Sequence, residues 1–160
     1  MVPILRPAAQ DPEPGAPFPL GTRQGRTRTI LRLVLAAAYL AAGVLHLYMP
    51  APFLRITPAW VPFPATVIAF TGLCEVAGAI GLMLPRLRWW AGVMLAAYAV
   101  CVYPANIKHA YDQVIIAGEL HSLAYHAPRL LFQPVIVWWA LFAGGVIDWP
   151  FRRPPPEPAA

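Results

Sequence analysis

The amino-acid sequence predicts an all-α integral membrane protein, a bundle of four transmembrane helices whose N-terminus and C-terminus are both cytoplasmic. Its composition is apolar: 59% of the 160 residues are hydrophobic and 12% are charged, against about 45–50% and about 25% in soluble domains. Four apolar segments each approach the roughly 20 residues that a helix needs to cross a bilayer. Arginine and lysine concentrate on one side of this arrangement, which predicts its orientation.

The four helices are expected over residues 29–48, 65–84, 89–107 and 130–147. The second contains Glu75, whereas the third and fourth contain no charged residue. Backbone polar groups must be satisfied internally in lipid, so these apolar runs are predicted to be helices. Together, residues 29–149 are predicted to form one transmembrane domain.

Two proline-rich segments flank this domain. Residues 1–28 are also rich in arginine and lack apolar periodicity, which predicts a disordered cytoplasmic tail. Residues 150–160 are expected to form a second cytoplasmic tail. No signal peptide is expected, because the first apolar run is too long for an h-region and lacks a convincing cleavage site.

The orientation follows from the basic residues that flank the helices. With the N-terminus inside, three of them lie outside: Arg55, Lys108 and Arg129. Nine lie on the cytoplasmic side: Arg6, Arg23, Arg26, Arg28, Arg32, Arg86, Arg88, Arg152 and Arg153. This excess is typical of a multi-pass protein of the cell (inner) membrane. The net charge of +5 is therefore not interpreted as a sign of nucleic-acid binding.

Glu75 is the strongest single functional signal. It lies about 15 Å into the second helix, near the middle of the bilayer. An ionised carboxylate is costly there, so it is expected to be protonated or partnered. Small neighbours such as Gly72 and Gly78 predict a packing face, so Glu75 is expected to point into the bundle. It is a candidate catalytic residue, as a proton relay, or alternatively a buried hydrogen-bonding carboxyl.

A second group of polar residues is predicted at the outer ends of the helices. The histidines all fall there: His46, His109, His121 and His126. The expected ligand-binding residues are His46, Asn106, Arg129, Gln133 and Trp60. Such donors suit a quinone carbonyl, an anionic substrate or a metal, although solvated interfacial histidines are the alternative. No metal site is predicted, because the spacing of His121 and His126 does not place two ligands on one helix face.

The connection over residues 49–64 is too apolar to extend freely into water. Its alternating prolines argue against a regular helix. We expect it to lie along the outer interface or to cap the bundle, with Phe53, Ile56 and Trp60 inserted.

The two cysteines, Cys74 and Cys101, form no C-x-x-C motif and are expected to be small buried residues.

Taken in order, four pieces of the chain resemble the DoxX and DoxX-like family of small four-helix membrane proteins. The resemblance covers residues 39–147 and rests on Gly43 and His46, Pro50, Phe53, Ile56, Pro58, Trp60 and Pro62, Gly72, Glu75, Gly78 and Gly81, Tyr103 to Ile107, and Arg129, Leu130 and Gln133. The chain departs from the family pattern in two places. Tyr103 stands where phenylalanine is commoner, and Leu131 where proline is usual.

The resemblance implies an accessory subunit of a quinone-linked membrane redox complex, without a complete redox centre of its own. Quinone is then the suspected cofactor, and a membrane or membrane-associated partner protein supplies the electrons. The alternative is a non-enzymatic membrane assembly, chaperone or structural partner protein, or a homo-oligomer, for which the small-residue stripes are suited. A third reading, small-solute or proton transport, rests on Glu75 alone.

Overall fold

The computed structural model describes residues 23–113 and 122–151, and this part of the chain is helical without any strand. It contains α1 (Arg23–Tyr48), α2 (Pro50–Ile56), α3 (Pro64–Met83), α4 (Arg88–Tyr111) and α5 (Leu123–Gly144). The four long helices are each long and apolar enough to cross a membrane. The predicted fold class, an all-α bundle of four transmembrane helices in a multi-pass membrane protein, is therefore confirmed.

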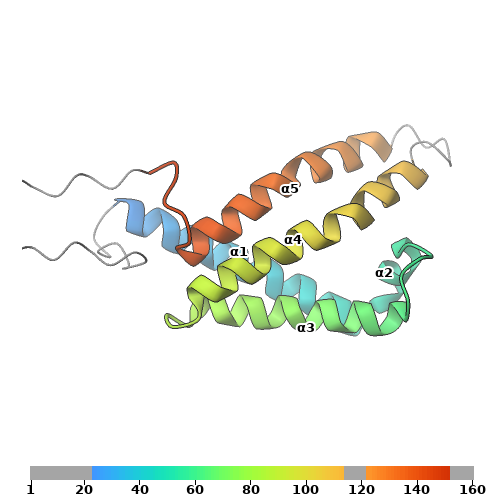
Figure 1. The fold of residues 1–160 in the computed structure, drawn as a ribbon, viewed down its shortest axis with the longest axis horizontal. Coiled ribbons are helices and arrows are strands. Elements are labelled where there is room, and N and C mark those ends of the chain that lie inside the picture. The colour runs from blue at the N-terminus through green and yellow to red at the C-terminus, as the bar shows by residue number, and fades with distance from the viewer. Residues whose placement is uncertain (1–22, 114–121, 152–160) are drawn as a thin grey trace, which may run out of the picture.

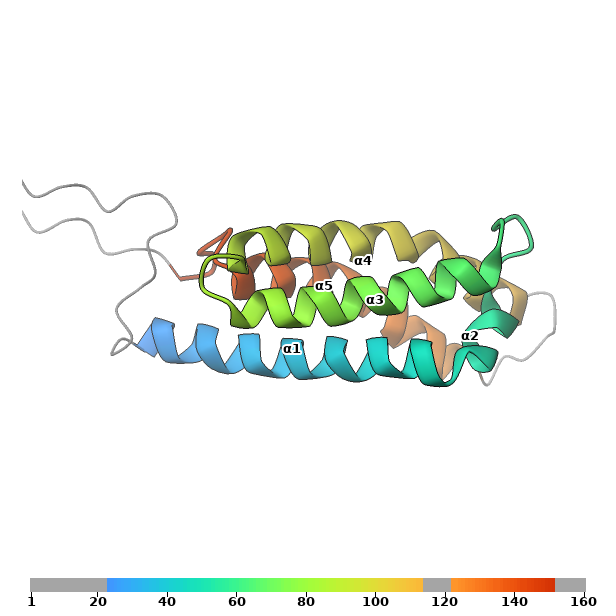
Figure 2. The same cartoon turned by 90° about the horizontal axis from the view of Figure 1, so that it is seen from below.

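The bundle consists of two closely packed helix pairs, α1 with α3 and α4 with α5 (Figures 1 and 2). Glycines make each close approach possible. A Cβ atom on Gly43 of α1 would lie 2.7 Å from the carbonyl oxygen of Gly72 on α3. A Cβ atom on Gly92 of α4 would lie 2.8 Å from the Cα of Gly144 on α5. These small residues are thus used for packing within the chain.

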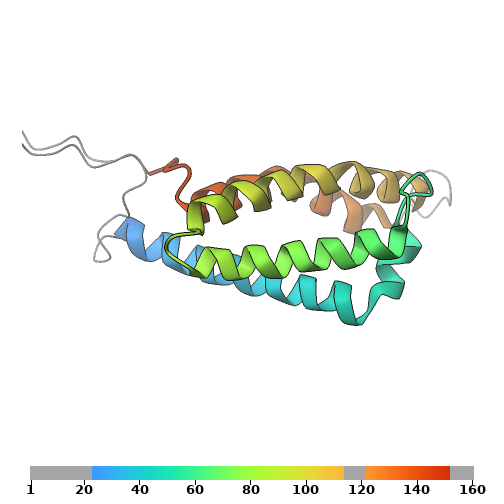
Figure 3. The same ribbon diagram turned by 60° about the horizontal axis from the view of Figure 1, so that its bottom comes forward.

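The two pairs lie close together at one end of the molecule and diverge toward the other, where α2 lies (Figures 1 and 3). The core follows this shape. A cluster of buried residues that includes Leu35, Leu82 and Leu95 joins the pairs on the side of the close end. The described ends of the chain, in α1 and after α5, also lie at this close end (Figure 1). We call it the closed end, and the end with α2 the open end.

The first helix begins at Arg23, so the prediction of a disordered tail is wrong for residues 23–28. The physical reason is a set of contacts that hold this turn against the end of α5. Arg28 is only 7% exposed, and its Nη2 donates to the Asp148 carboxylate at 2.6 Å and to the Ile147 carbonyl at 2.9 Å. One turn later, the Arg32 Nε donates to the Ala143 carbonyl at 2.8 Å. The rest of both predicted tails, residues 1–22 and 152–160, lies outside the described residues.

The last helix begins at Leu123 rather than at residue 130. Its first two turns carry His126 and Arg129, which lower the hydropathy but pack against the end of α4. It ends at Gly144 because Gly145 adopts a left-handed φ of 79°. The amide of Val146 then donates to the Leu141 carbonyl, and that of Gly145 to Phe142, as in a Schellman cap.

A short helix, α2, occupies the connection where no regular helix was expected, so that prediction is wrong for Pro50–Ile56. Pro50 and Pro52 are tolerated because they lie in the first turn, where backbone N–H groups have no helical partner. The expectation of a cap is confirmed for Phe53, which is half-buried over His46. Ile56 and Trp60 are exposed.

Candidate functional site

The crossing of α1 and α3 brings His46 and Glu75 together. Gly43 lies one turn before His46, and Gly72 lies one turn before Glu75, so the close backbone contact aligns the two polar residues. A Cβ atom on Gly72 would lie 2.9 Å from the Cβ of His46. The glycine pair therefore sets the distance between the imidazole and the carboxyl group.

The Glu75 side chain is buried and has partners on two other helices. Its Oε1 accepts a hydrogen bond of 2.9 Å from the hydroxyl of Tyr98 on α4. Its Oε2 lies 2.9 Å from the Nδ1 of His46. Glu75 is 5% exposed, so the prediction that it points into the bundle is confirmed. We call Glu75, His46 and Tyr98 the interhelical triad.

The contacts of His46 indicate where its hydrogen lies. Its Nδ1 is 2.9 Å from the carbonyl oxygen of Ala42, which can only accept. The hydrogen is therefore on Nδ1 and is donated to the Ala42 carbonyl, whereas the Oε2 of Glu75, although 2.9 Å from this nitrogen, is buried without a hydrogen-bond partner among the described residues. The carboxyl group therefore accepts one hydrogen bond, from Tyr98, and its other oxygen faces the His46 imidazole in an apolar environment.

Aromatic rings enclose the triad on two sides. The Phe53 ring of α2 stacks on the His46 imidazole, with centroids 3.8 Å apart and an interplanar angle of 22°. The Tyr39 ring of α1 meets Tyr98 edge-on, with centroids 6.2 Å apart. Phe53 thus covers one face of His46 from the open end, and Tyr39 lies beside Tyr98.

Tyr98 was missed by sequence reasoning, although a signal for it exists. Glu75 lies eight residues before the end of α3, and Tyr98 lies ten residues after the start of α4, so both lie at a similar depth. In a helical hairpin, residues at equal distances from the connection face each other. Matching polar residues by depth would therefore have paired this hydroxyl with the carboxyl group.

A second polar group, which we call the basic cluster, lies between the end of α4 and the start of α5. The Arg129 Nη2 donates to the Asn106 carbonyl at 3.3 Å and lies 3.2 Å from the Nδ1 of His109. His126 is 0% exposed, its Nε2 lies 2.7 Å from the Oε1 of Gln113, and its ring meets that of His109 edge-on.

Gln133 belongs to neither group. Its Nε2 donates to the Ala99 carbonyl at 2.5 Å, and its side chain is buried. Beside it, between α4 and α5, is a hollow of about 270 Å³ that is lined by Val100, Tyr103, Gln133, Pro134 and Val137. This volume is at the lower end of the range for small-molecule sites.

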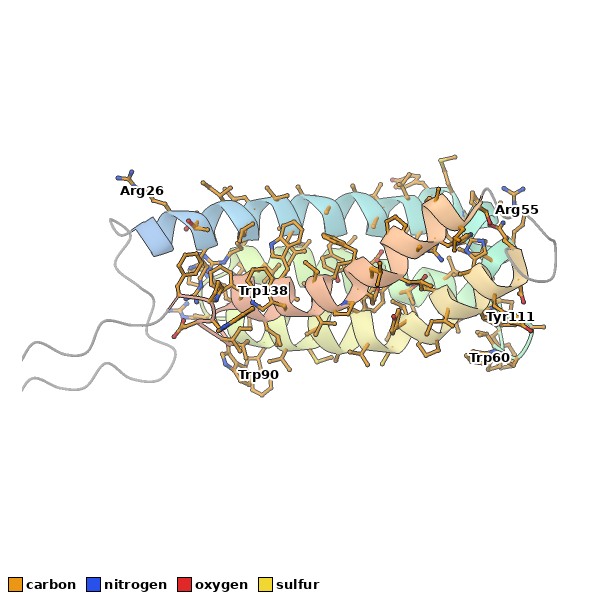
Figure 4. All side chains as sticks on the ribbon, turned by 90° about the horizontal axis from the view of Figure 1, so that it is seen from above. Arg26, Arg55, Trp60, Trp90, Tyr111 and Trp138 are labelled. Carbon is orange, nitrogen blue, oxygen red and sulfur yellow. The ribbon has the colours of Figure 1, made fainter. Side chains whose placement is uncertain are left out.

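The structure brings some of the predicted ligand-binding residues together and distributes the others. His46 lies with Glu75 in the triad, whereas Arg129 and the backbone of Asn106 lie in the basic cluster. Trp60 is 67% exposed and lies at the open end, as do Arg55 and Tyr111, whereas Arg26, Trp90 and Trp138 lie toward the closed end (Figure 4). His121 lies outside the described residues.

Metal ligands and thiols are dispersed in the part of the chain that the structure describes. Residues 23–113 and 122–151 contain no group of three or more metal-ligating side chains suited to an ion. Both cysteines are free. Cys74 is half-buried, but Cys101 is exposed, so the expectation of burial is wrong for Cys101, which lies on an outer face of α4.

The comparisons with known proteins identify one family. A family model described as "Domain of unknown function (DUF8561)" matches residues 35–144, which include the triad and the basic cluster. No curated protein and no solved structure matches the chain.

Proposed function

We propose that this chain, which belongs to the DUF8561 family, is an accessory subunit of a quinone-linked membrane redox complex and binds the quinone head group at the interhelical triad. The observation that carries this proposal is the buried chain of contacts from Tyr98 through Glu75 to His46. A carboxyl group inside an apolar bundle, with one oxygen bonded to Tyr98 and the other buried without a hydrogen-bond partner among the described residues, is more than packing requires, and polar groups of this kind in membrane helices are typically functional.

The residues of the triad fit a planar ring with carbonyl acceptors. His46 carries an N–H group and Tyr98 an O–H group, and each can donate a hydrogen bond to a carbonyl oxygen. Glu75 lies between these two residues. Phe53 already occupies the face of the His46 ring at stacking distance. We propose that the head group takes the place of Phe53 when α2 moves aside.

A bound quinone supplies two-electron, two-proton chemistry, and a partner protein supplies the electrons. The chain's own residues handle protons. Glu75 holds a proton in a site from which lipid and α2 exclude water. Tyr98 orients the carboxyl group through its hydrogen bond, and His46 lies beside the other oxygen, near the end of α1. Glu75 therefore acts as the proton relay between the head group and the membrane surface.

We further propose a kinship with the DoxX-like proteins, an orientation with both termini in the cytoplasm and a location in the cell (inner) membrane. The kinship is supported by the order of shared residues, since His46, Glu75 and Arg129 all belong to motifs of that resemblance. The orientation is supported by the basic residues that gather toward the closed end, such as Arg28, Arg32 and Arg88.

Mass spectrometry of organic extracts from protein purified in mild detergent tests the proposal. Wild type is expected to carry near-stoichiometric quinone, and His46→Ala to lose it. Arg129→Ala is the matched variant from the basic cluster and should retain the quinone. Wild type that carries none, and binds none when titrated, would contradict the proposal.

A second candidate function, membrane assembly, is favoured by a different observation. Ala37, Ala38 and Ala41 form an exposed small-residue stripe on α1 that no other described helix covers. Such stripes allow close packing of a partner helix. Crosslinking from a cysteine introduced at Ala38 should capture a partner helix or a second copy, whereas a solitary species would count against assembly.

A further inference from the structure

Arg129 is a cation whose contacts with the described residues are all with uncharged groups. It lies in the membrane-spanning helix α5, two turns from its start. Its recorded acceptors are a backbone carbonyl and a neutral imidazole, those of Asn106 and His109. No carboxylate within residues 23–113 and 122–151 forms an ion pair with it. A charge in this environment is normally paired, and none of the described residues supplies the anion.

Two N–H groups of the basic cluster also lack acceptors. Because the Arg129 guanidinium can only donate, the Nδ1 of His109 is an acceptor and its hydrogen is on Nε2. In the described structure, this Nε2 and the Nε of Arg129 are both buried without a hydrogen-bond partner. The two side chains contact each other at 3.2 Å, so the unused donors belong to one site.

The surroundings are suited to an oxygen anion. Lys108, the nearest other cation on α4, is already neutralised by Asp112 at 2.5 Å, so Arg129 carries the excess charge. The Tyr125 ring packs against the guanidinium, 5.4 Å from ring centroid to Cζ, and fixes its plane. His126 is fully buried against the His109 ring and holds it in place. The donors are therefore positioned before any ligand arrives.

We propose that Arg129 and His109 form a phosphate-binding site at the open end of the bundle, separate from the interhelical triad. A phosphate group offers several acceptor oxygens, as two neighbouring donors require, and a guanidinium is the residue type that recognises it best. The group is either the headgroup of an anionic phospholipid or free phosphate.

Binding to the full-length protein in detergent tests the site with three probes: inorganic phosphate, phosphatidylglycerol, and a glucosyl diacylglycerol that has the same chains but no phosphate. Native mass spectrometry and the Tm of wild type give the readout. Both phosphate probes should bind and raise the Tm if the group is phosphate in general. Phosphatidylglycerol alone should do so if the lipid is the ligand. The proposal is overturned if neither phosphate probe binds better than the glycolipid.

Variants assign the binding to these residues. Arg129→Gln should weaken binding of the effective probe at least about tenfold, because it removes the charge-assisted hydrogen bonds. His109→Phe keeps a ring against His126 but removes the Nε2 donor, and it should weaken binding as well. Arg55→Gln, at an exposed site on α2, is the control and should bind as wild type does. Unchanged binding in Arg129→Gln or His109→Phe would overturn the proposal. If either variant fails to fold, the comparison of the three probes on the wild-type protein still decides between the outcomes.

Discussion

Glu75 depends on residues from three other helices. Tyr98 donates a hydrogen bond to it and His46 lies 2.9 Å from its other oxygen, while Phe53 and Tyr39 exclude lipid from these contacts. In a low-dielectric interior, such hydrogen bonds are stronger than in water, and an unpaired group is correspondingly more costly. Each member of the triad should therefore contribute to stability as well as to the proposed chemistry.

Replacing Tyr98 by phenylalanine tests the hydrogen bond to Glu75. It leaves Oε1 buried without this donor, so the free energy of unfolding should fall by about 1–3 kcal/mol. The measurement is reversible unfolding in mixed micelles with increasing dodecyl sulfate. Tyr103→Phe removes a hydroxyl from the same helix that makes no recorded hydrogen bond among the described residues. Equal losses of stability in Tyr98→Phe and Tyr103→Phe would contradict a contribution of the Tyr98–Glu75 hydrogen bond.

Sequence reasoning identified Glu75 but not its partner on α4, for a physical reason. A carboxyl group in an apolar run is conspicuous because its burial is costly. Tyr98 resembles any interfacial tyrosine, because its aromatic ring suits the interior as well as the interface. The sequence placed Arg129 and His109 in one polar group at the outer ends of the helices, but their direct contact was not predicted, since it requires the first turns of α5, which lie outside the apolar segment.

At the scale of the element, the glycine contact between α1 and α3 sets the geometry of the triad. Neither helix has room for a side chain at Gly43 or Gly72, where added Cβ atoms would meet backbone within 3.0 Å. Real Cβ atoms do not approach a carbonyl oxygen so closely, so any larger residue must separate the helices. The distance between His46 and Glu75 then increases with that separation.

We predict that Gly43→Ala destabilises the fold and disrupts the triad together. Overpacking should lower the free energy of unfolding by about 1–3 kcal/mol, and the quinone content should fall because His46 moves from Glu75. Unfolding in mixed micelles and mass spectrometry of extracts give the two readouts. Ala37→Val adds volume at an exposed position of the same helix and should change neither. Normal stability in Gly43→Ala would contradict the packing described here.

The closed end is held by a clasp, which we define as the contacts of Arg28 and Arg32 with the end of α5. The carbonyls at a helix C-terminus carry partial negative charge, so cations are stabilising there. Asp148 adds a partly buried ion pair, with 8% of the Arg28 side chain and 30% of the Asp148 side chain exposed. The clasp joins the two helix pairs and leaves the open end free to widen.

Asp148→Asn should therefore lower the free energy of unfolding by about 1–3 kcal/mol, because it removes the charge beside a buried guanidinium. The matched control is Asp112→Asn, which breaks the exposed pair with Lys108 on one helix and should cost under about 0.5 kcal/mol. Both are measured by the same unfolding titration. An equal loss in Asp148→Asn and Asp112→Asn would show that burial of the clasp contributes nothing to the free energy of unfolding.

The short helix α2 is a cover for the triad, so its removal should change the kinetics of ligand exchange. Phe53→Ala is expected to speed the exchange of a labelled quinone by about tenfold, because it removes the ring stacked on His46. Ile56→Ala shortens an exposed side chain of the same helix and should leave the rate unchanged. Equal exchange rates in the two variants would exclude this role for Phe53.

The whole molecule combines a fixed closed end with a diverging open end. The glycine contact of Gly92 and Gly144 and the clasp both lie toward the closed end, whereas α2 and the basic cluster lie at the open end. The triad lies between them, so a ligand from the membrane reaches it by way of the open end.

The architecture could be predicted from the sequence because long apolar runs in lipid have few alternatives to helices. The boundaries of α3 agree to within one residue, since Pro64 begins it and the apolar run ends with it. The start of α1 and the whole of the short helix α2 could not be predicted from the apolar runs. Their residues become helical through tertiary contacts, those of Arg28 with Asp148 and of Phe53 with His46, which hydropathy does not record.

Photoaffinity labelling with an azido-quinone tests the central claim, binding of a quinone head group at the interhelical triad, most directly. The full-length protein is labelled in detergent, with excess unlabelled quinone as the competitor, and the modified peptides are identified by mass spectrometry. The account predicts competable label on residues of α1, α2 and α4 around His46, Phe53 and Tyr98. Label confined to the hollow beside Gln133, or label that the competitor does not reduce, would contradict it.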